Sequence, residues 1–209
     1  MNSEENSDYI RILILGSSGV GLNLIKTYLN ELLFEEVFWY GYKTFESLEK
    51  LESGEIIKVK FSVLNVPVHG RELNSSRKTF GAILVVDLTD PKSFEIVKSN
   101  VSRVLGNKYM YITILEYKDK KAKEFKINSD EVRQFAQDNN FDYQTLLSDD
   151  KGNTVKIIKD IIEKTYKFKE SIINQRKKIY QEKKVEKEKE DKKEKKVKKC
   201  FWCFKCCCP

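Results

Sequence analysis

Three runs of apolar residues along the chain predict strands that are buried on both faces. They are YIRILIL at 9–15, AILVVD at 82–87 and YMYITIL at 109–115. Short apolar runs of this kind are typical of the interior strands of a parallel sheet. Gly54 lies between two further predicted strands and indicates a hairpin turn there. These further strands, with a last one near the end of the domain, are predicted at 36–43, 56–66 and 142–147.

Apolar residues at helical spacing predict four helices between and after these strands. The first helix starts at Leu22, directly behind the opening strand. Asp90-Pro91 favours the start of the second helix, because Asp caps helices and Pro suits the first helical position. A capping-box sequence predicts the third helix near 129–139. An apolar stripe at 155–166 predicts the last helix.

The alternation of strands and helices predicts an α/β fold, with a mostly parallel sheet, an antiparallel edge and helices on both faces. We expect this domain to span residues 9–169, after a disordered N-terminus at 1–8. The remaining segment, 170–209, is expected to be a charged, polybasic, Cys-rich tail that targets membranes. Its near-uniform charge at 182–199 leaves two alternatives, an extension of the last helix or a solvated tether.

The positive charge of the chain belongs to this tail. Residues 176–209 contain fourteen Lys and Arg and six Asp and Glu, a net charge of +8, whereas the whole chain has a net charge of +7. The domain itself is therefore slightly acidic, and Glu is interleaved among the tail lysines, so we expect no nucleic-acid partner. The sequence has no signal-peptide pattern and no apolar stretch long enough to span a bilayer, which predicts a cytosolic chain.

A glycine-rich turn joins the first predicted strand to the first helix, the position of a phosphate-binding loop. Phosphate loops of this kind follow the pattern G-x-x-x-x-G-K-[ST]. The two pattern glycines are present, but Leu22 stands in place of the Lys and Asn23 in place of the Ser or Thr. The predicted nucleotide-contacting residues of this loop are Gly16, Ser17, Ser18, Gly19, Val20, Gly21, Leu22 and Asn23.

The two replacements remove side chains that a phosphate loop uses. Backbone N–H groups and the helix N-terminus can still face an anion. Leu22 brings no charge to the phosphates, and Asn23 offers Mg²⁺ only an amide oxygen. A tight turn that lets helix and strand pack closely explains the same glycines, and we weigh the two explanations equally.

Several segments in order resemble the Ras superfamily of small GTPases, and within it the Rab branch. GAILVVDLTDPKSFEIV, from Gly81 to Val97, is very similar to the family stretch G-x-I-L-V-Y-D-x-T-D-x-x-S-F-x-x-V. RILILGSSGVG resembles the family's phosphate loop without its Lys and Ser, and the FAQDNNFDYQTLLSDDKGNTVKIIKDII segment resembles the family's closing region. The resemblance implies a P-loop NTPase-type, Ras-like fold that binds GTP or GDP with Mg²⁺ and works with effector and regulatory proteins.

The departures from the family concentrate on the nucleotide. The D-T-A-G-Q-E segment corresponds either to Asn65–His69 or to Pro67–Glu72, and neither register keeps the Mg²⁺-linked Asp or the water-positioning Gln. The base-reading N-K-x-D falls at 117–120. Thr44 is the nearest candidate for the family's switch Thr, at a spacing a few residues too long. The family's base-site contacts are carried over to Lys118, Asp119 and Ser148 alone.

These departures predict a family member in which GTP binding is weakened or lost, Mg²⁺ is poorly held and hydrolysis is negligible. We expect no catalytic residue, and we interpret His69, the only histidine, as structural or exposed. The alternative is a nucleotide-independent membrane adaptor with the same fold, a pseudo-GTPase scaffold.

The cysteines lie together at the end of the tail. Rab-like proteins often have paired C-terminal cysteines that receive prenyl groups, and a single lipid needs a second lipid or a polybasic patch to hold a membrane. We therefore expect prenylation and palmitoylation, with the lysines of 192–199 against an anionic leaflet at the cytoplasmic face of a membrane. A metal site with C-x-x-C spacing is the less favoured alternative. The candidate lipidation sites are Cys200, Cys203, Cys206, Cys207 and Cys208.

Overall fold

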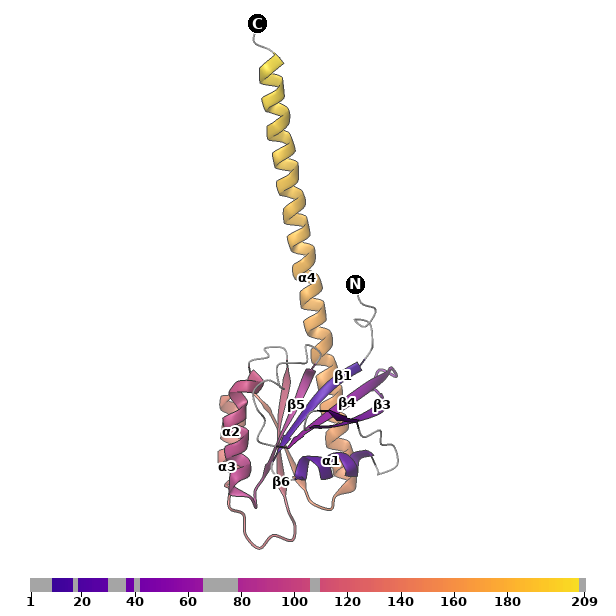
Figure 1. Cartoon of the computed structure of the whole chain (residues 1–209), viewed down its shortest axis with the longest axis vertical. Coiled ribbons are helices and arrows are strands. Elements are labelled where there is room, and N and C mark those ends of the chain that lie inside the picture. The colour runs from indigo at the N-terminus through magenta and orange to yellow at the C-terminus, as the bar shows by residue number, and fades with distance from the viewer. Residues whose placement is uncertain are drawn as a thin grey trace. The chain divides into compact units, whose positions relative to one another are not determined.

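The structure is a computed structural model that describes residues 9–16, 19–29, 37–39, 42–65, 79–105 and 110–206. Strands and helices alternate along most of this length (Figure 1). The elements are β1 (Tyr9–Gly16), α1 (Val20–Leu29), β2 (Val37–Trp39), β3 (Tyr42–Lys50), β4 (Ile56–Asn65), β5 (Thr79–Asp87), α2 (Pro91–Leu105), β6 (Tyr111–Lys118), α3 (Ser129–Asp138), β7 (Asp142–Leu147) and α4 (Lys151–Cys206).

The seven strands form one mixed sheet in the order β2-β3-β4-β1-β5-β6-β7. From β4 to β7 all neighbouring strands are parallel, and β3 and β2 add an antiparallel edge. The predicted α/β fold with a mostly parallel sheet and an antiparallel edge is therefore confirmed. The first strand lies in the middle of the sheet, so its C-terminal end at Gly16 has a strand on either side.

The helices of the domain cover both faces of the sheet and create two apolar clusters. One cluster packs the sheet against α1 and the first part of α4, and the other packs it against α2 and α3. Along β1, Ile12 and Ile14 belong to the first cluster, whereas Leu13 and Leu15 belong to the second. This alternation explains the uniformly apolar run in the sequence, because each face of a central strand is buried.

Most predicted helix and strand positions are confirmed within a few residues. Asn128 caps α3 as expected, since its side-chain oxygen accepts a hydrogen bond of 2.9 Å from the backbone N–H of Asp130. The hairpin at Gly54 is also confirmed, and the positive φ of +87° at this residue explains why glycine occupies the turn.

The first strand of the hairpin was placed too early in the sequence. The prediction put it at 36–43, whereas the strand that pairs with β4 is β3, at Tyr42–Lys50, and only the short β2 falls inside the predicted range. The sequence of β3 mixes charged and apolar residues because only one of its faces is buried: Phe45 is 1% exposed, whereas Leu48 is 73% exposed. An alternating pattern of this kind is weaker than a continuous apolar run.

The chain divides into two compact units, residues 1–169 and residues 170–209. In the second unit the backbone remains helical as far as Cys206, which favours the helical alternative for the tail over an irregular tether. The described side chains at 174–184 are all exposed. Over the residues that the structure describes, no helix is both long and apolar enough to cross a bilayer.

Candidate functional site

Gly19 is the one described residue between β1 and α1. β1 ends at Gly16, and α1 begins at Val20. Gly19 has a φ of +87°, and its carbonyl accepts a hydrogen bond of 2.9 Å from the backbone N–H of Asn23. A residue with a side chain would be strained at this φ, so the turn itself requires glycine. Ser17 and Ser18 lie outside the described residues.

Close packing accounts for the two glycines of the phosphate-loop pattern. A Cβ atom on Gly16 would lie 3.0 Å from the Cβ of Val85, on the neighbouring strand β5. A Cβ atom on Gly21 would lie only 2.9 Å from Cγ2 of Ile14, where α1 crosses β1. Both glycines thus let backbone segments approach, and this packing role needs no bound phosphate.

Leu22 and Asn23 have different environments at the start of α1. Leu22, in the place of the phosphate-binding Lys, is partly buried and packs against the apolar cluster beneath α1 and α4. Asn23, in the place of the Mg²⁺-binding Ser or Thr, is exposed. The position that would supply positive charge to a phosphate therefore contributes to the core instead.

A small pocket adjoins the loop on the side of the predicted base contacts. It has a volume of about 240 Å³ and lies between α1, the ends of β6 and β7, and the residues that lead into α4. Asn23, Tyr117 and Ser148 are among its lining residues, so the structure brings the predicted loop and base contacts to one place. The volume is below the range of roughly 300–1,000 Å³ that is usual for small-molecule sites.

Two of the predicted base-site residues are hydrogen-bonded to each other. The hydroxyl of Ser148 donates to Oδ1 of Asp119 at 3.1 Å and accepts the backbone N–H of Lys120 at 2.8 Å. The backbone N–H of Lys121 also donates to Asp119 Oδ1, at 2.9 Å. These bonds hold the loop after β6 against the end of β7, and they already use one oxygen of the Asp119 carboxylate.

Lys118, the third base-site residue, pairs with a carboxylate that the sequence analysis missed. Its Nζ lies 2.9 Å from Oε1 of Glu116, an ion pair without hydrogen-bond geometry. Glu116 is fully buried, and its Oε2 accepts a hydrogen bond of 2.6 Å from the hydroxyl of Tyr143. The signal in the sequence is a single acidic residue that directly follows an apolar run and lies within β6, because buried carboxylates are rare unless they are paired.

Tyr117, which lines the pocket, has several carboxylates near it. Burial raises the pKa of Tyr117, and the nearby carboxylates of Asp119, Asp87 and Asp149 raise it further. The charged residues that line the pocket are Asp149, Asp150 and Lys151, so the lining has one more negative than positive group. This lining offers an anionic phosphate no excess of positive charge.

Asp150 has a structural role at the start of α4. Its Oδ1 accepts the backbone N–H of Asn153 at 2.9 Å, and its carbonyl accepts the hydroxyl of Thr154 at the same distance. Asp149 precedes it with a φ of +63°. The two residues that replace the family's A-K after Ser148 thus form a helix-capping turn, a role that needs no nucleotide.

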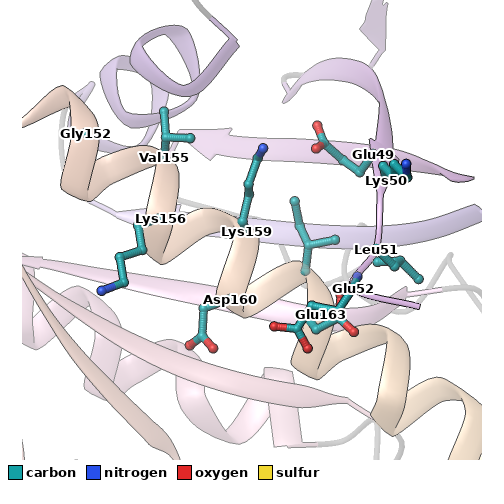
Figure 2. A pocket seen from close by; sticks show the side chains of 11 residues that line it. Glu49, Lys50, Leu51, Glu52, Gly152, Val155, Lys156, Lys159, Asp160 and Glu163 are labelled. Carbon is teal, nitrogen blue, oxygen red and sulfur yellow. Dashed lines mark hydrogen bonds between the residues drawn. The ribbon is translucent and has the colours of Figure 1, made fainter. Parts of the chain in front are cut away.

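A larger pocket of about 510 Å³ lies on another side of the domain, between α4 and the β3–β4 turn. Figure 2 shows side chains of both charges around it, with Glu49 and Lys159 approaching from opposite walls. None of the predicted nucleotide contacts lines this pocket. It therefore adds nothing to the predicted nucleotide site.

The remaining predicted site residues fall into two groups. Thr44 lies within β3, paired with Val37 on one side and Ser62 on the other, which is a strand position rather than a switch loop. Residues 66–72, including His69, lie outside the described residues. Among the residues whose side chains are described, no three His, Cys, Asp or Glu residues form a group that could hold a metal ion.

The cysteines of the tail are described only in part. Cys200, Cys203 and Cys206 lie in the last turns of α4, where the backbone alone is described, and Cys207 and Cys208 lie outside the described residues. The structure therefore does not distinguish lipidation of these cysteines from metal binding by them.

No protein-family model matches the chain, and no curated protein matches it.

Proposed function

We propose that the chain is a Rab-like member of the Ras superfamily that is anchored to the cytoplasmic face of a membrane by lipids. In this proposal it recruits partner proteins in vesicle traffic or signalling, and its GTP binding is weakened or lost. The order of the segments that resemble the family supports the assignment. The most similar segment, Gly81–Val97, forms β5 and the first half of α2, beside the central strand β1.

The packing of Leu22 is the observation that supports loss of nucleotide binding most directly. A phosphate-binding Lys must extend into solvent toward the ligand, whereas Leu22 packs against the apolar core. To bind a phosphate, the side chain at position 22 would need a positive charge and would have to point away from the core. The charged lining of the adjoining pocket, Asp149, Asp150 and Lys151, supports the same conclusion, because it gives phosphates no excess of positive charge.

Purified full-length protein is expected to bind neither fluorescent GDP nor fluorescent GTP at high micromolar concentration, with or without Mg²⁺. The physical reason is that Leu22 carries no charge, and that Lys151, the one lysine lining the pocket, lies among the carboxylates of Asp149 and Asp150. Fluorescence anisotropy measures the binding, and circular dichroism confirms that the protein is folded. A Ser148→Ala variant serves as the control and should give the same result as the unmodified protein. Nanomolar binding that is lost in this variant would show that the base site works.

Lipid attachment is expected at the C-terminal cysteines. In cells that supply labelled prenyl and palmitoyl precursors, Ser substitution of Cys206, Cys207 and Cys208 together should abolish prenyl label and move the protein to the soluble fraction. Substitution of Cys200 and Cys203 should remove palmitoyl label, because their thiols are the expected acceptors. It should also weaken membrane association, because one prenyl chain gives only marginal binding. Zinc bound stoichiometrically by the unlabelled tail would instead support the metal-site alternative.

A further inference from the structure

The β3–β4 hairpin exposes two large aliphatic side chains on one face of the sheet. Leu48 is 73% exposed and Ile56 is 65% exposed, the highest values among the large apolar residues described in unit 1. Leu48 lies opposite Lys58 in the strand register, and Ile56 lies opposite Lys50. Residues opposite each other share a face, so the two aliphatic side chains are diagonal neighbours on a single surface.

Lysines surround this aliphatic pair. We define the hairpin patch as Leu48, Lys50, Ile56, Lys58 and Lys60, which alternate along β3 and β4 on the face opposite the buried Phe45 and Phe61. The only carboxylate on the same face of the two strands is that of Glu46, which forms ion pairs with both Lys58 and Lys60.

The balance of charge on the patch is therefore positive. Three lysines stand against one glutamate, and among the described residues Lys50 forms no ion pair. Ion pairing with the two lysines lowers the pKa of the Glu46 carboxyl despite the opposing effect of partial burial. Glu46 thus remains charged, yet it can neutralise only one of its two partners.

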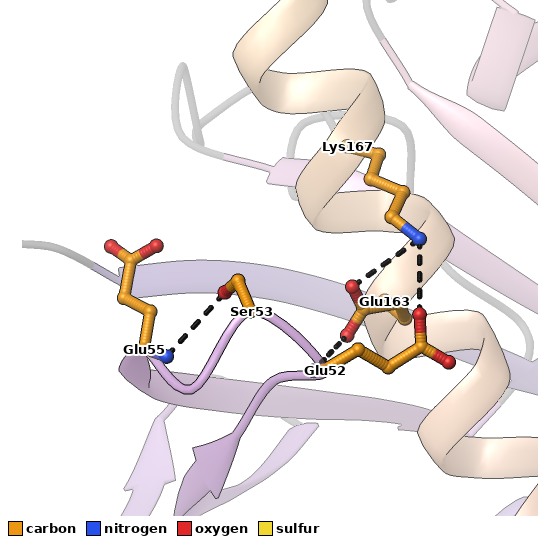
Figure 3. A network of polar contacts seen from close by, with 5 residues as sticks. All are labelled: Glu52, Ser53, Glu55, Glu163 and Lys167. Carbon is orange, nitrogen blue, oxygen red and sulfur yellow. Dashed lines mark hydrogen bonds and ion pairs between the residues drawn. The ribbon is translucent and has the colours of Figure 1, made fainter.

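The acidic residues of the hairpin turn are held away from the patch, against α4. Figure 3 shows Lys167 between the carboxylates of Glu52 and Glu163, with Nζ–O distances of 3.3 and 3.4 Å. The backbone N–H of Glu52 also donates to Glu163 at 3.2 Å, and the hydroxyl of Tyr166 donates to Glu55 at 2.8 Å. These contacts hold the carboxylates of the turn toward α4, whereas Lys58 and Lys60 lie on the other face of the strands. Lys50, next to the turn, also lines the pocket beside α4.

We propose that the hairpin patch docks on an anionic lipid surface, with Leu48 and Ile56 entering the headgroup region and Lys50, Lys58 and Lys60 contacting acidic headgroups. Exposed aliphatic side chains surrounded by lysines match a surface that is apolar beneath a negatively charged layer. The proposal rests on the membrane function proposed above, and it adds a contact made by the folded domain to the one made by the lipidated tail.

The test uses full-length protein without lipid modification and phosphatidylcholine vesicles with and without phosphatidylserine. Every variant keeps the same polybasic tail, so any difference between variants reports on the hairpin. Leu48→Ser combined with Ile56→Ser is expected to weaken sedimentation with phosphatidylserine vesicles by at least about fivefold. Lys50→Glu should weaken it as well. Phe125→Ser, at an exposed aromatic residue in the loop after β6, is the matched control and should leave it unchanged.

A second measurement reports insertion directly. In Leu48→Trp the tryptophan emission should shift to shorter wavelength when phosphatidylserine vesicles are added, whereas Phe125→Trp should show no added shift. Equal vesicle affinity of the unmodified and doubly substituted proteins would overturn the proposal. So would a concentration-dependent dimer that these substitutions disrupt, because the patch would then contact a second copy of the chain. Neither outcome depends on lipidation or nucleotide binding, so the proposed function would be tested separately.

Discussion

Replacement of Gly81 by alanine is expected to destabilise the domain by about 3 kcal/mol, through a clash between β5 and α4. A Cβ atom at this position would lie 2.8 Å from Oγ1 and 2.9 Å from Cγ2 of Thr165, and 3.3 Å from Cγ1 of Ile12. β5 is hydrogen-bonded to β1 on one side and β6 on the other, so the strand cannot move aside. The helix must therefore shift, which would open gaps in the apolar cluster that it covers.

The clash can be separated from other effects by changing its partner. Thr165→Ala removes the two atoms nearest to the new Cβ and leaves only Cγ1 of Ile12, at 3.3 Å. The double variant Gly81→Ala with Thr165→Ala should therefore recover most of the lost free energy of unfolding. Urea unfolding followed by near-ultraviolet circular dichroism reports on the packed domain. Gly152→Ala is the control, because its new Cβ would approach only Asp150 Oδ1, at 3.9 Å, and should not destabilise. Additive effects of the two substitutions would show that the clash is not the cause.

Glu116→Ala is expected to lower the free energy of unfolding by about 3 kcal/mol, because Glu116 contacts both other members of a polar cluster, Tyr143 and Lys118. The variant would leave the Tyr143 hydroxyl without its 2.6 Å acceptor and Lys118 without its counter-charge. It would also leave a cavity in a fully buried position. The loss should therefore exceed that of a surface ion pair, which is worth roughly 0–1 kcal/mol.

Two further variants distinguish the parts of this cluster. Glu116→Gln keeps an oxygen that can accept from Tyr143 and should cost clearly less than the alanine variant. Tyr143→Phe removes only the hydroxyl and should cost about 1 kcal/mol. Thermal and urea unfolding measure all three. If the alanine and glutamine variants were equally unstable, the charge on Glu116 rather than its hydrogen bond would be the dominant contribution.

The strands and helices could largely be predicted because short stretches of sequence determine most of them. The apolar runs of β1, β5 and β6 have both faces buried, and the capping signals at Pro91 and Asn128 act within one helical turn. β3 was misplaced because its pattern depends on which face the rest of the protein covers. A half-buried strand with charged residues gives a weak local signal.

The candidate site could be predicted only as a set of positions. The sequence placed Asp119 and Ser148 together by resemblance, and the structure joins them by a hydrogen bond of 3.1 Å. It could not show that Gly21 is required by Ile14, or that Glu116 pairs with Lys118. These are contacts between side chains and backbone segments whose distance from each other is set by the packing of the whole domain.

The sequence by itself determined the alternation of strands and helices, the mostly parallel sheet and the gathering of every cysteine at the end of a basic tail. The periodicity of apolar residues, helix-capping residues and local composition act over a few residues, so they can be recognised in the sequence. Only the tertiary structure decided that the glycines of the phosphate-loop pattern allow close packing, that the partly buried Leu22 packs against the core, and that the hairpin presents aliphatic residues among lysines. Those properties depend on which surfaces meet, and distant segments meet only in the folded protein.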